Sequence, residues 1–278
     1  MRKICLIIVS LLVSFTANPA PKPEMIVVCY PGGAVNAKDA NGAMNSMLRV
    51  VERVGKWQEN SLNSLFTAKS DECRKQMSEK KPKFAITSLG IYLELRTRYN
   101  LMPVVQPKIK GRTSERYRVM AQKGKYKSLD ELKGKTLGGT VLEEQSFIGK
   151  IVFAGKYDPA SFFVLKKSNQ AIRALRSLDK GELDAVILNE QQFAGLASLH
   201  LQTSLEAVFT SEEVPLMGVV ANSATTTAEE RARFGKALEE MCTDAEGKKL
   251  CDLFGVESFV AVDPTVFEPM VKLWAKGN

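Results

Sequence analysis

Residues 84–92 read Phe-Ala-Ile-Thr-Ser-Leu-Gly-Ile-Tyr, and this stretch decides the fold class. Phe84 to Thr87 form a short apolar run of the length expected for a buried strand. The small residues Ser88 and Gly90 then mark a turn, and a helix is expected from about Ile91 to Tyr99. A strand that turns directly into a helix is the repeating unit of α/β sheets.

The same alternation continues on both sides of this stretch. Ile26 to Tyr30 is a compact apolar run that ends at Pro31-Gly32-Gly33, which predicts a buried strand followed by a turn. Met44 to Val54 carries its apolar residues at helical spacing. Further strands are expected near residues 61–68, 101–105, 117–121, 136–140, 162–165, 184–188 and 215–221. The whole chain therefore predicts an α/β fold.

Helix starts are marked by capping residues. Ser128, Thr227 and Thr243 are each followed three residues later by Glu, which is the capping-box pattern. Ser70 and Ser168 are predicted N-caps, the latter of a helix that reaches about residue 179. The absence of any repeat or low-complexity linker indicates that two lobes, if present, are joined by extended segments.

The first 20 residues have the order of a secretory signal. Met1-Arg2-Lys3 is basic, Ile4 to Phe15 is apolar, and small residues and proline follow. The apolar part is shorter than the roughly 20 residues that a membrane-spanning helix needs. We therefore predict a signal peptide over residues 1–20 and a periplasmic protein, with an N-terminal membrane anchor as the alternative.

The composition indicates a folded chain, and its net positive charge weakly favours anionic partners. Hydrophobic residues make up 45% of the 278 residues, which is enough for a core. The formal charge of +8 becomes +6 once Arg2 and Lys3 are removed with the signal. No nucleic-acid-binding module is recognisable, so we expect no nucleic-acid partner. We also expect a monomeric protein.

Four cysteines remain after the signal. An even number in an exported chain permits disulfides. Cys242 and Cys251 are the best candidate pair, because one helix is expected to end near the first and the next helix carries the second. Buried free thiols remain the alternative. A zinc site is not expected, since the chain has one histidine, His200, and no Cys-x-x-Cys.

Motifs for catalysis or nucleotide binding are missing. His200 has no serine-centred turn beside it, so a loop histidine is the simpler interpretation. Gly134-Lys135-Thr136 resembles the end of a phosphate-binding loop, but Leu129 stands where that motif requires glycine. We expect no cofactor, no metal and no enzyme activity, and these absences favour a binding protein.

The order of the segments resembles type II periplasmic solute-binding proteins, in particular the phosphate/phosphonate-binding branch of ABC transporter components. The resemblance is carried by residues 84–92, by Tyr117 to Ala121 with Ser128 to Thr136, by Gly181-Glu182-Leu183-Asp184-Ala185-Val186, and by Leu253 to Phe259. It implies a type II two-lobed fold in which each lobe is an α/β sheet and two extended crossings form the hinge. Lobe 1 would hold residues 25–120 and 216–278, and lobe 2 residues 121–215.

The resemblance also implies a ligand site in the cleft between the lobes, and closure about the hinge that buries the ligand. Turns that precede helices offer backbone amides and hydroxyl donors to such a ligand. The candidate ligand-binding residues in these turns are Tyr30, Ser88, Thr140, Ser146, Ser168 and Asn189. For each of them, an ordinary capping or turn role is the alternative.

One stretch departs from the family pattern. Where phosphonate binders show Ser, Thr and Gly, this chain reads Leu142-Glu143-Glu144-Gln145-Ser146. Two carboxylates there would repel an anion unless they face solvent, so a neutral or cationic solute also remains open. A second feature, the basic stretch from Lys108 to Lys127 with Glu115 as its one acid, is predicted to be a solvated face beside the hinge.

The sequence therefore predicts an exported protein that captures a small solute, phosphate- or phosphonate-like, for the permease of an ABC importer. One alternative is a sensing or interaction protein that keeps the fold without transport. The other is an exported enzyme, for which Cys29 with Glu144 or Glu190 is the conceivable nucleophile and base.

Overall fold

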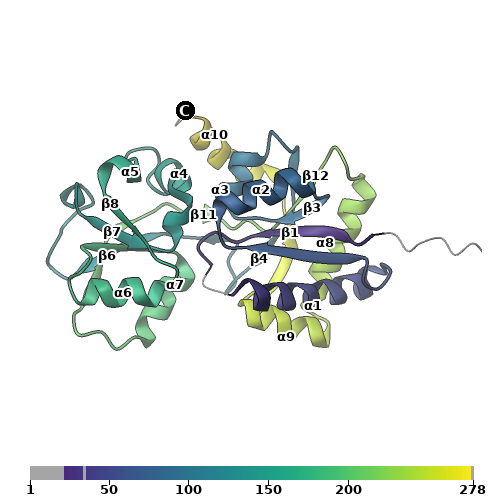
Figure 1. The fold of residues 1–278 in the computed structure, drawn as a ribbon, viewed down its shortest axis with the longest axis horizontal. Coiled ribbons are helices and arrows are strands. Elements are labelled where there is room, and N and C mark those ends of the chain that lie inside the picture. The colour runs from purple at the N-terminus through teal and green to yellow at the C-terminus, as the bar shows by residue number, and fades with distance from the viewer. Residues whose placement is uncertain (1–21, 34–35, 277–278) are drawn as a thin grey trace, which may run out of the picture.

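The computed structural model describes residues 22–33 and 36–276. The predicted signal peptide, residues 1–20, lies outside this part of the chain. Within it, two α/β lobes lie side by side, each built on its own sheet (Figure 1). The α/β prediction is confirmed. No helix among the described residues is long and apolar enough to span a bilayer.

Lobe 1 is built on a six-stranded sheet that uses both ends of the chain. Strand β1 is parallel to its neighbours β2 and β3, whereas β12 and β13 each run antiparallel to β4. The strand order is β13 (Ser258–Ala261), β4 (Leu101–Lys108), β12 (Val219–Asn222), β3 (Phe84–Ile86), β1 (Glu24–Cys29) and β2 (Leu62–Thr67).

Alternation along β1 explains why helices cover both faces of this sheet. Ile26 and Val28 pack on one side against α1 and α8, and Val27 and Cys29 pack on the other side with residues of α2 and α3. The helices of lobe 1 are α1 (Ala37–Gly55), α2 (Ser70–Lys80), α3 (Leu89–Leu95), α8 (Ala228–Met241), α9 (Ala245–Phe254) and α10 (Glu268–Lys276), with the 3₁₀-helix η5 (Pro264–Phe267) before α10.

Lobe 2 has a five-stranded mixed sheet. Its strand order is β10 (Leu205–Thr210), β6 (Arg118–Gln122), β9 (Ala185–Leu188), β7 (Thr136–Gly139) and β8 (Val164–Lys167). Its helices are α4 (Gln145–Phe147), α5 (Pro159–Phe162), α6 (Ala171–Asp179) and α7 (Glu190–Gly195), with the 3₁₀-helices η1 (Asp130–Leu132), η2 (Val141–Glu144) and η4 (Leu196–Ser198) and the π-helix η3 (Ile148–Val152).

Two short extended segments connect the lobes. β5 (Ser114–Glu115) and β11 (Val214–Pro215) pair antiparallel as a separate two-stranded sheet. The expected lobe boundary after residue 120 falls inside β6, and the one after residue 215 directly follows β11. The residue ranges of the lobes remain a proposal.

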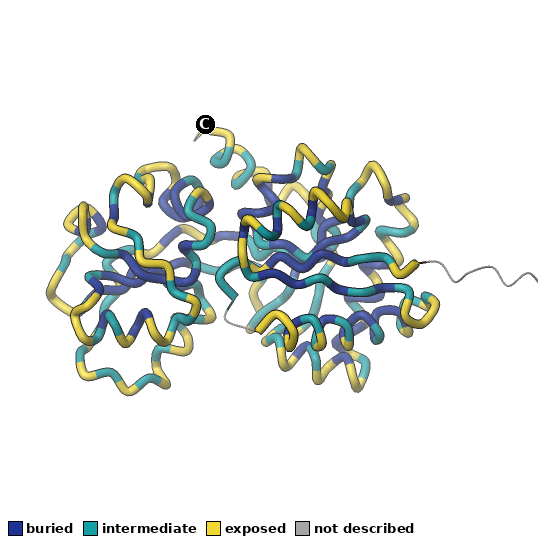
Figure 2. Tube along the Cα trace, viewed as in Figure 1, coloured by how far each residue is buried: buried dark blue, intermediate teal, exposed yellow. Residues whose placement is uncertain are grey.

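The two lobes share one apolar core. A single buried cluster contains Cys29 and Leu89 of lobe 1, Tyr117 at the crossing, and Phe147 and Ile187 of lobe 2. Figure 2 shows the buried strands at the centre of both lobes and the exposed faces outside them. The lobes are thus packed against each other and not merely tethered.

Helix starts were predicted with mixed success. The capping box at Thr227 is confirmed, because the Thr227 side chain accepts from the amide of Glu230 and the Glu230 side chain accepts in return. The prediction for Ser168 was wrong by two residues: α6 begins at Ala171, since Ser168 bonds Gln170 in a local turn instead. At α9 the N-cap is Asp244 and not the predicted Thr243.

Candidate functional site

Four loops meet where the two lobes face each other. From lobe 1 come the segment after β1 and the turn between β3 and α3, and from lobe 2 come the segment after β7 and the start of α7. All four follow the carboxyl ends of strands, the edge where α/β sheets place ligand sites. These loops contain the predicted residues Tyr30, Ser88, Thr140 and Asn189.

Ser88 is the clearest contact between the lobes. As N-cap of α3, its hydroxyl oxygen accepts from the amide of Ile91 at 3.2 Å. The same hydroxyl donates to Oε1 of Glu144 in lobe 2 at 2.8 Å. Its neighbour Thr87 is 3% exposed, and the Thr87 hydroxyl has no partner among the described residues. This turn therefore offers two hydroxyl groups and an amide beside each other.

Glu143 makes a second contact next to the first. One of its carboxylate oxygens accepts from the amide of Ser70 at 3.2 Å, and its backbone carbonyl accepts from the Ser70 hydroxyl at 3.0 Å. Lys167 of lobe 2 holds the other carboxylate oxygen at 3.3 Å. Ser70 was predicted to cap α2, but that helix has no side-chain cap, because the Ser70 hydroxyl is used across the lobe junction.

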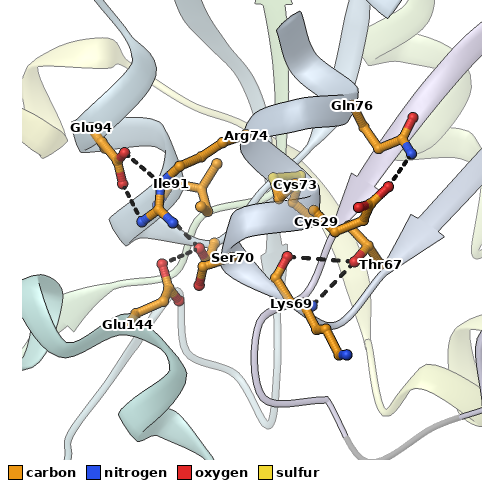
Figure 3. The surroundings of a disulfide bond; sticks show 12 residues. Cys29, Thr67, Lys69, Ser70, Cys73, Arg74, Gln76, Ile91, Glu94 and Glu144 are labelled. Atoms are coloured by element: carbon orange, nitrogen blue, oxygen red, sulfur yellow. Dashed lines mark hydrogen bonds and ion pairs between the residues drawn. A yellow bond between two sulfur atoms is a disulfide. The ribbon is translucent and has the colours of Figure 1, made fainter. Parts of the chain in front are cut away.

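Both glutamates therefore face lobe 1. The side chain of Glu143 is 23% exposed, and Figure 3 shows Glu144 reaching from lobe 2 toward Ser70, Ile91 and Arg74. The solvent-facing orientation that would have left room for an anion is not what the structure shows.

Burial raises the pKa of Glu144 to about 7. The nearby carboxylate of Glu94 raises it further, while hydrogen bonds from Ser88 and the Ile91 amide and the charge of Arg74 oppose the shift. Glu94 itself is paired with Arg74, at 2.6 Å (Figure 3). Near neutral pH this carboxyl group is therefore divided between its protonated and ionised forms.

Thr140 and Asn189 are brought together within lobe 2. Thr140 is 3% exposed, and its hydroxyl oxygen accepts from the side-chain amide of Gln192 at 2.8 Å. Gln192 in turn forms a capping box with Asn189 at the start of α7. The backbone of Thr140 also lies directly against Gly32 of lobe 1, where a Cβ atom would overlap the Thr140 carbonyl.

Tyrosines and a carboxylate line the junction at the crossing. The hydroxyl of Tyr117 donates to Glu115 at 2.9 Å, and the amide of Glu190 bonds the same carboxylate. Half of the Tyr30 surface is exposed, and partial withdrawal of its hydroxyl from water together with the charge of Glu115 raises its pKa. Burial raises the pKa of Tyr117 strongly, with Glu115, Glu144 and Tyr30 as charged or titratable neighbours.

Two of the predicted residues lie apart from this meeting point. Ser146 is exposed on α4 and lines a cavity of about 180 Å³ at the edge of the junction, together with Arg74, Glu94 and Trp274. The hydroxyl of Ser168 is engaged with Gln170 within its own loop. Glu144, the partner of Ser88, lines the same cavity, so Ser146 is connected to the meeting point through this cavity, whereas Ser168 is not.

Sequence reasoning missed several residues of the junction. It did not single out Tyr117 or Gln192, and it named Glu115 only as the one acid of a basic stretch. Its position as the one acid in a basic stretch was the sequence feature that could have identified Glu115 as a residue of the junction. Cys29 also lies here, and it forms a disulfide with Cys73 of α2 (Figure 3). Because that thiol is not free, the alternative of a Cys29 nucleophile is wrong.

The second disulfide joins Cys242 and Cys251, the candidate pair, with Cα atoms 5.8 Å apart. In the part of the chain that the structure describes, no group of His, Cys, Asp and Glu side chains is arranged to hold a metal ion. The chemistry of the junction is thus that of hydroxyls, amides and carboxyls, which suits recognition of a small polar solute.

Two α/β lobes with a double crossing and facing loops define a two-lobed periplasmic binding protein. Residues 30–267 match the family described as ABC transporter, phosphonate, periplasmic substrate-binding protein. The chain belongs to this family, whose members are periplasmic components of importers and serve a permease. Members of the family bind substrates and are not described as enzymes.

Solved structures agree in fold. A protein from Xanthomonas citri bound to ATP has 12% identity and a TM-score of 0.68, covering 91% of this chain and 96% of its own. A binding protein component of an ABC phosphonate transporter from Pseudomonas aeruginosa has 17% identity and a TM-score of 0.68, with coverage of 90% and 85%. A Prochlorococcus marinus protein in complex with methylphosphonate has 13% identity and a TM-score of 0.66, with coverage of 91% and 98%. No curated protein matches the sequence.

Proposed function

We propose that this chain is exported through the signal peptide at residues 1–20 and acts as a monomer in the periplasm. There it captures a small solute with an anionic head group between its lobes and presents it to the permease of an ABC importer. The observation that carries the proposal is the meeting of strand-end loops from both lobes at Ser88 and Glu144, 2.8 Å apart.

Export is supported by the two disulfides, because such bonds persist in oxidising compartments and are rare in the cytosol. The expectation of no nucleic-acid partner stands on the same argument, since an exported protein does not meet nucleic acid in its working compartment.

An anionic head group is supported by the donors at the junction. Ser88, Thr87 and the Ile91 amide are groups that a carboxylate or phosphonate oxygen accepts from. Glu144 of the protein itself already accepts from two of them, so an anionic solute has to displace this carboxyl group to bind here. Methylphosphonate and ATP, bound by the structural relatives, are also anions.

The test is a thermal-shift screen of the mature chain, from Lys22, against anions, amino acids and neutral solutes. A solute that binds only the folded protein stabilises it by about 2.7 kcal/mol at a hundredfold excess over its dissociation constant. We expect anionic solutes to raise the melting temperature. Ser88→Ala should abolish this rise, whereas Ser223→Ala, on the lobe 1 surface, should preserve it. If no solute class shifts the melting temperature, capture of a small solute is not the function.

A further inference from the structure

The strongest feature that solute capture alone does not explain is the pair of adjacent carboxyl groups in η2. Glu144 accepts from Ser88, and Glu143 accepts from the amide of Ser70, so neighbouring residues of lobe 2 reach two different helices of lobe 1. The carbonyl of Glu143 also accepts from the Ser70 hydroxyl. Lys167 anchors the Glu143 carboxylate to lobe 2. Every lobe 1 donor in this set is a hydroxyl or a backbone amide.

These contacts occupy the positions that an anionic solute would need. A carboxylate or phosphonate oxygen from solution would have to accept from the Ser88 hydroxyl and the Ile91 amide, and Glu144 accepts from both. The glutamate side chain therefore competes directly with such a solute.

The lobes approach each other closely beside this pair, which also lines the cavity of about 180 Å³. A Cβ atom on Gly90 would overlap the Glu144 carboxylate and would lie 2.9 Å from Cβ of Phe147. On the other side of the junction, Gly32 leaves equally little space beside the carbonyl of Thr140. The ring of Phe147 packs edge-on against Tyr117, with centroids 5.5 Å apart. Protein groups of both lobes thus contact each other directly at this part of the junction.

We propose that Glu143 and Glu144 form a carboxyl latch, an internal substitute for an anionic ligand that closes the two lobes when no solute is bound. An anionic solute binds by displacing Glu144 from Ser88. This inference rests on the proposed function for the identity of the solute, but closure by the latch does not depend on it.

The latch lowers apparent affinity, because only the open form receives solute. When the competent form is a fraction of the population, the apparent dissociation constant rises by the inverse of that fraction. A latch that keeps about nine molecules in ten closed would therefore weaken binding roughly tenfold. Removing it should open the protein and tighten anion binding by that factor.

The closure is measured as the distance between spin labels on the two lobes. Glu79→Cys on α2 and Lys166→Cys on β8 are exposed attachment sites, and the four cysteines among the described residues are paired. Without solute, we expect one short distance in the wild-type sequence. In Glu143→Ala/Glu144→Ala, we expect a longer and broader distribution. The same distribution in both proteins would overturn the latch.

A matched control uses another adjacent glutamate pair, Glu239 and Glu240, on α8. Glu240 lies one turn from Lys236 of the same helix, so Glu239→Ala/Glu240→Ala removes the same two charges without touching lobe 2. This variant should keep the short distance. If the latch variant fails to fold, Ser88→Ala removes the lobe 1 partner of Glu144 and should give a smaller shift in the same direction. An unchanged distance in that folded variant would also overturn the latch.

Titration with methylphosphonate and inorganic phosphate separates the latch from the proposed function. One outcome is a longer distance in the latch variant while neither probe, nor any solute in the screen, binds. That outcome supports the latch and rejects solute capture. Binding of a probe with equal affinity in both proteins, at unchanged distance, keeps solute capture and rejects the latch. Opening together with about tenfold tighter binding supports both.

Discussion

At the residue scale, Glu144 combines two features that rarely occur together. It is a carboxyl group withdrawn from water, yet it contacts a hydroxyl and an amide that favour its ionised form. The withdrawal is the larger effect, so the pKa rises to about 7 and not below its ordinary value. An acid of this kind stabilises the closed, folded protein in its protonated form.

The raised pKa of Glu144 makes the free energy of unfolding fall as the pH rises. Between the ordinary carboxyl pKa of 4.5 and about 7, the folded protein holds a proton on Glu144 that the unfolded chain has released. The stabilisation is therefore complete below pH 4.5 and is lost as the pH rises through 7. We expect the free energy of unfolding of the wild type to fall relative to Glu144→Gln between pH 5 and 8, on the order of 2 to 3 kcal/mol.

Denaturant unfolding at several pH values measures that difference. Other carboxyls with raised pKa, Glu24 and Glu115, are present in both proteins and cancel in the comparison. Glu79→Gln, on the exposed face of α2, is the control and should give a difference that does not change with pH. A pH-independent difference for Glu144→Gln as well would show that this group titrates normally.

Gly32 and Gly111 test close approach of the lobes separately from backbone conformation. Both have φ of +75°, where alanine costs roughly 1–2 kcal/mol. Alanine at Gly111 meets no atom within 4 Å, whereas at Gly32 it would overlap the backbone of Thr140.

We expect Gly111→Ala to lower stability by the conformational cost alone. Gly32→Ala should lower it further and should lengthen the distance between the labelled lobes, because the overlapping backbone cannot yield as a flexible side chain would. Thermal unfolding and the spin-label distance measure the two effects. Equal behaviour of the two variants would mean that the lobes are not in contact at Gly32 in solution.

At the element scale, sequence reasoning succeeded where one local pattern decides the outcome. The strand at Phe84 to Ile86 and the capping box at Thr227 follow from neighbouring residues, and both are present. It failed where a side chain has a distant partner. Ser70 is a good N-cap by type, but its hydroxyl bonds Glu143, which is 73 residues away.

The candidate site shows the same limit. Ser88 was predicted from its place between a strand and a helix, and it lies at the junction. The role of Glu144 could not be predicted, because its direction depends on how lobe 2 packs against lobe 1. The pairing of Cys29 with Cys73 was missed for a related reason: it needs β1 and α2 to lie side by side, which no local pattern specifies.

The two disulfides close loops of different length and should differ in effect. The sequence separation is 44 for Cys29–Cys73 and 9 for Cys242–Cys251. In the chain-entropy treatment these loops correspond to about 4 and about 2.5 kcal/mol of stabilisation.

We therefore expect Cys29→Ser/Cys73→Ser to lower the free energy of unfolding more than Cys242→Ser/Cys251→Ser. The first bond also ties the end of β1 to α2, so its loss should reduce any solute-induced thermal shift as well. Urea unfolding of both double variants measures the first effect, and the solute screen measures the second. A larger loss for the shorter loop would contradict the expectation from loop length.

At the scale of the whole molecule, the C-terminal helix is a further connection between the lobes. α10 follows η5, whose Phe267 is buried near Tyr92 of lobe 1, with ring centroids 5.7 Å apart. It then contacts α3 of lobe 1 and η3 of lobe 2, and Figure 1 shows it above the junction. Near its end, Trp274 lies 5.0 Å from the ammonium nitrogen of Lys150 in lobe 2. The lobes are therefore connected by the two crossing strands, by the carboxyl pair and by this helix.

The two tryptophans of the chain allow a matched test of that connection. Trp274 bridges the lobes, whereas Trp57 packs within lobe 1 against Phe234 and Arg233. Trp274→Ala removes the packing of a partly buried ring and a cation–π contact worth about 0.5–1 kcal/mol, so it should shift the spin-label distance outward less than loss of both glutamates does. Trp57→Ala should lower the melting temperature through lost packing but leave the distance unchanged. Should Trp274→Ala leave the distance unchanged too, α10 moves with one lobe only, and closure depends on the crossing strands and the carboxyl pair alone.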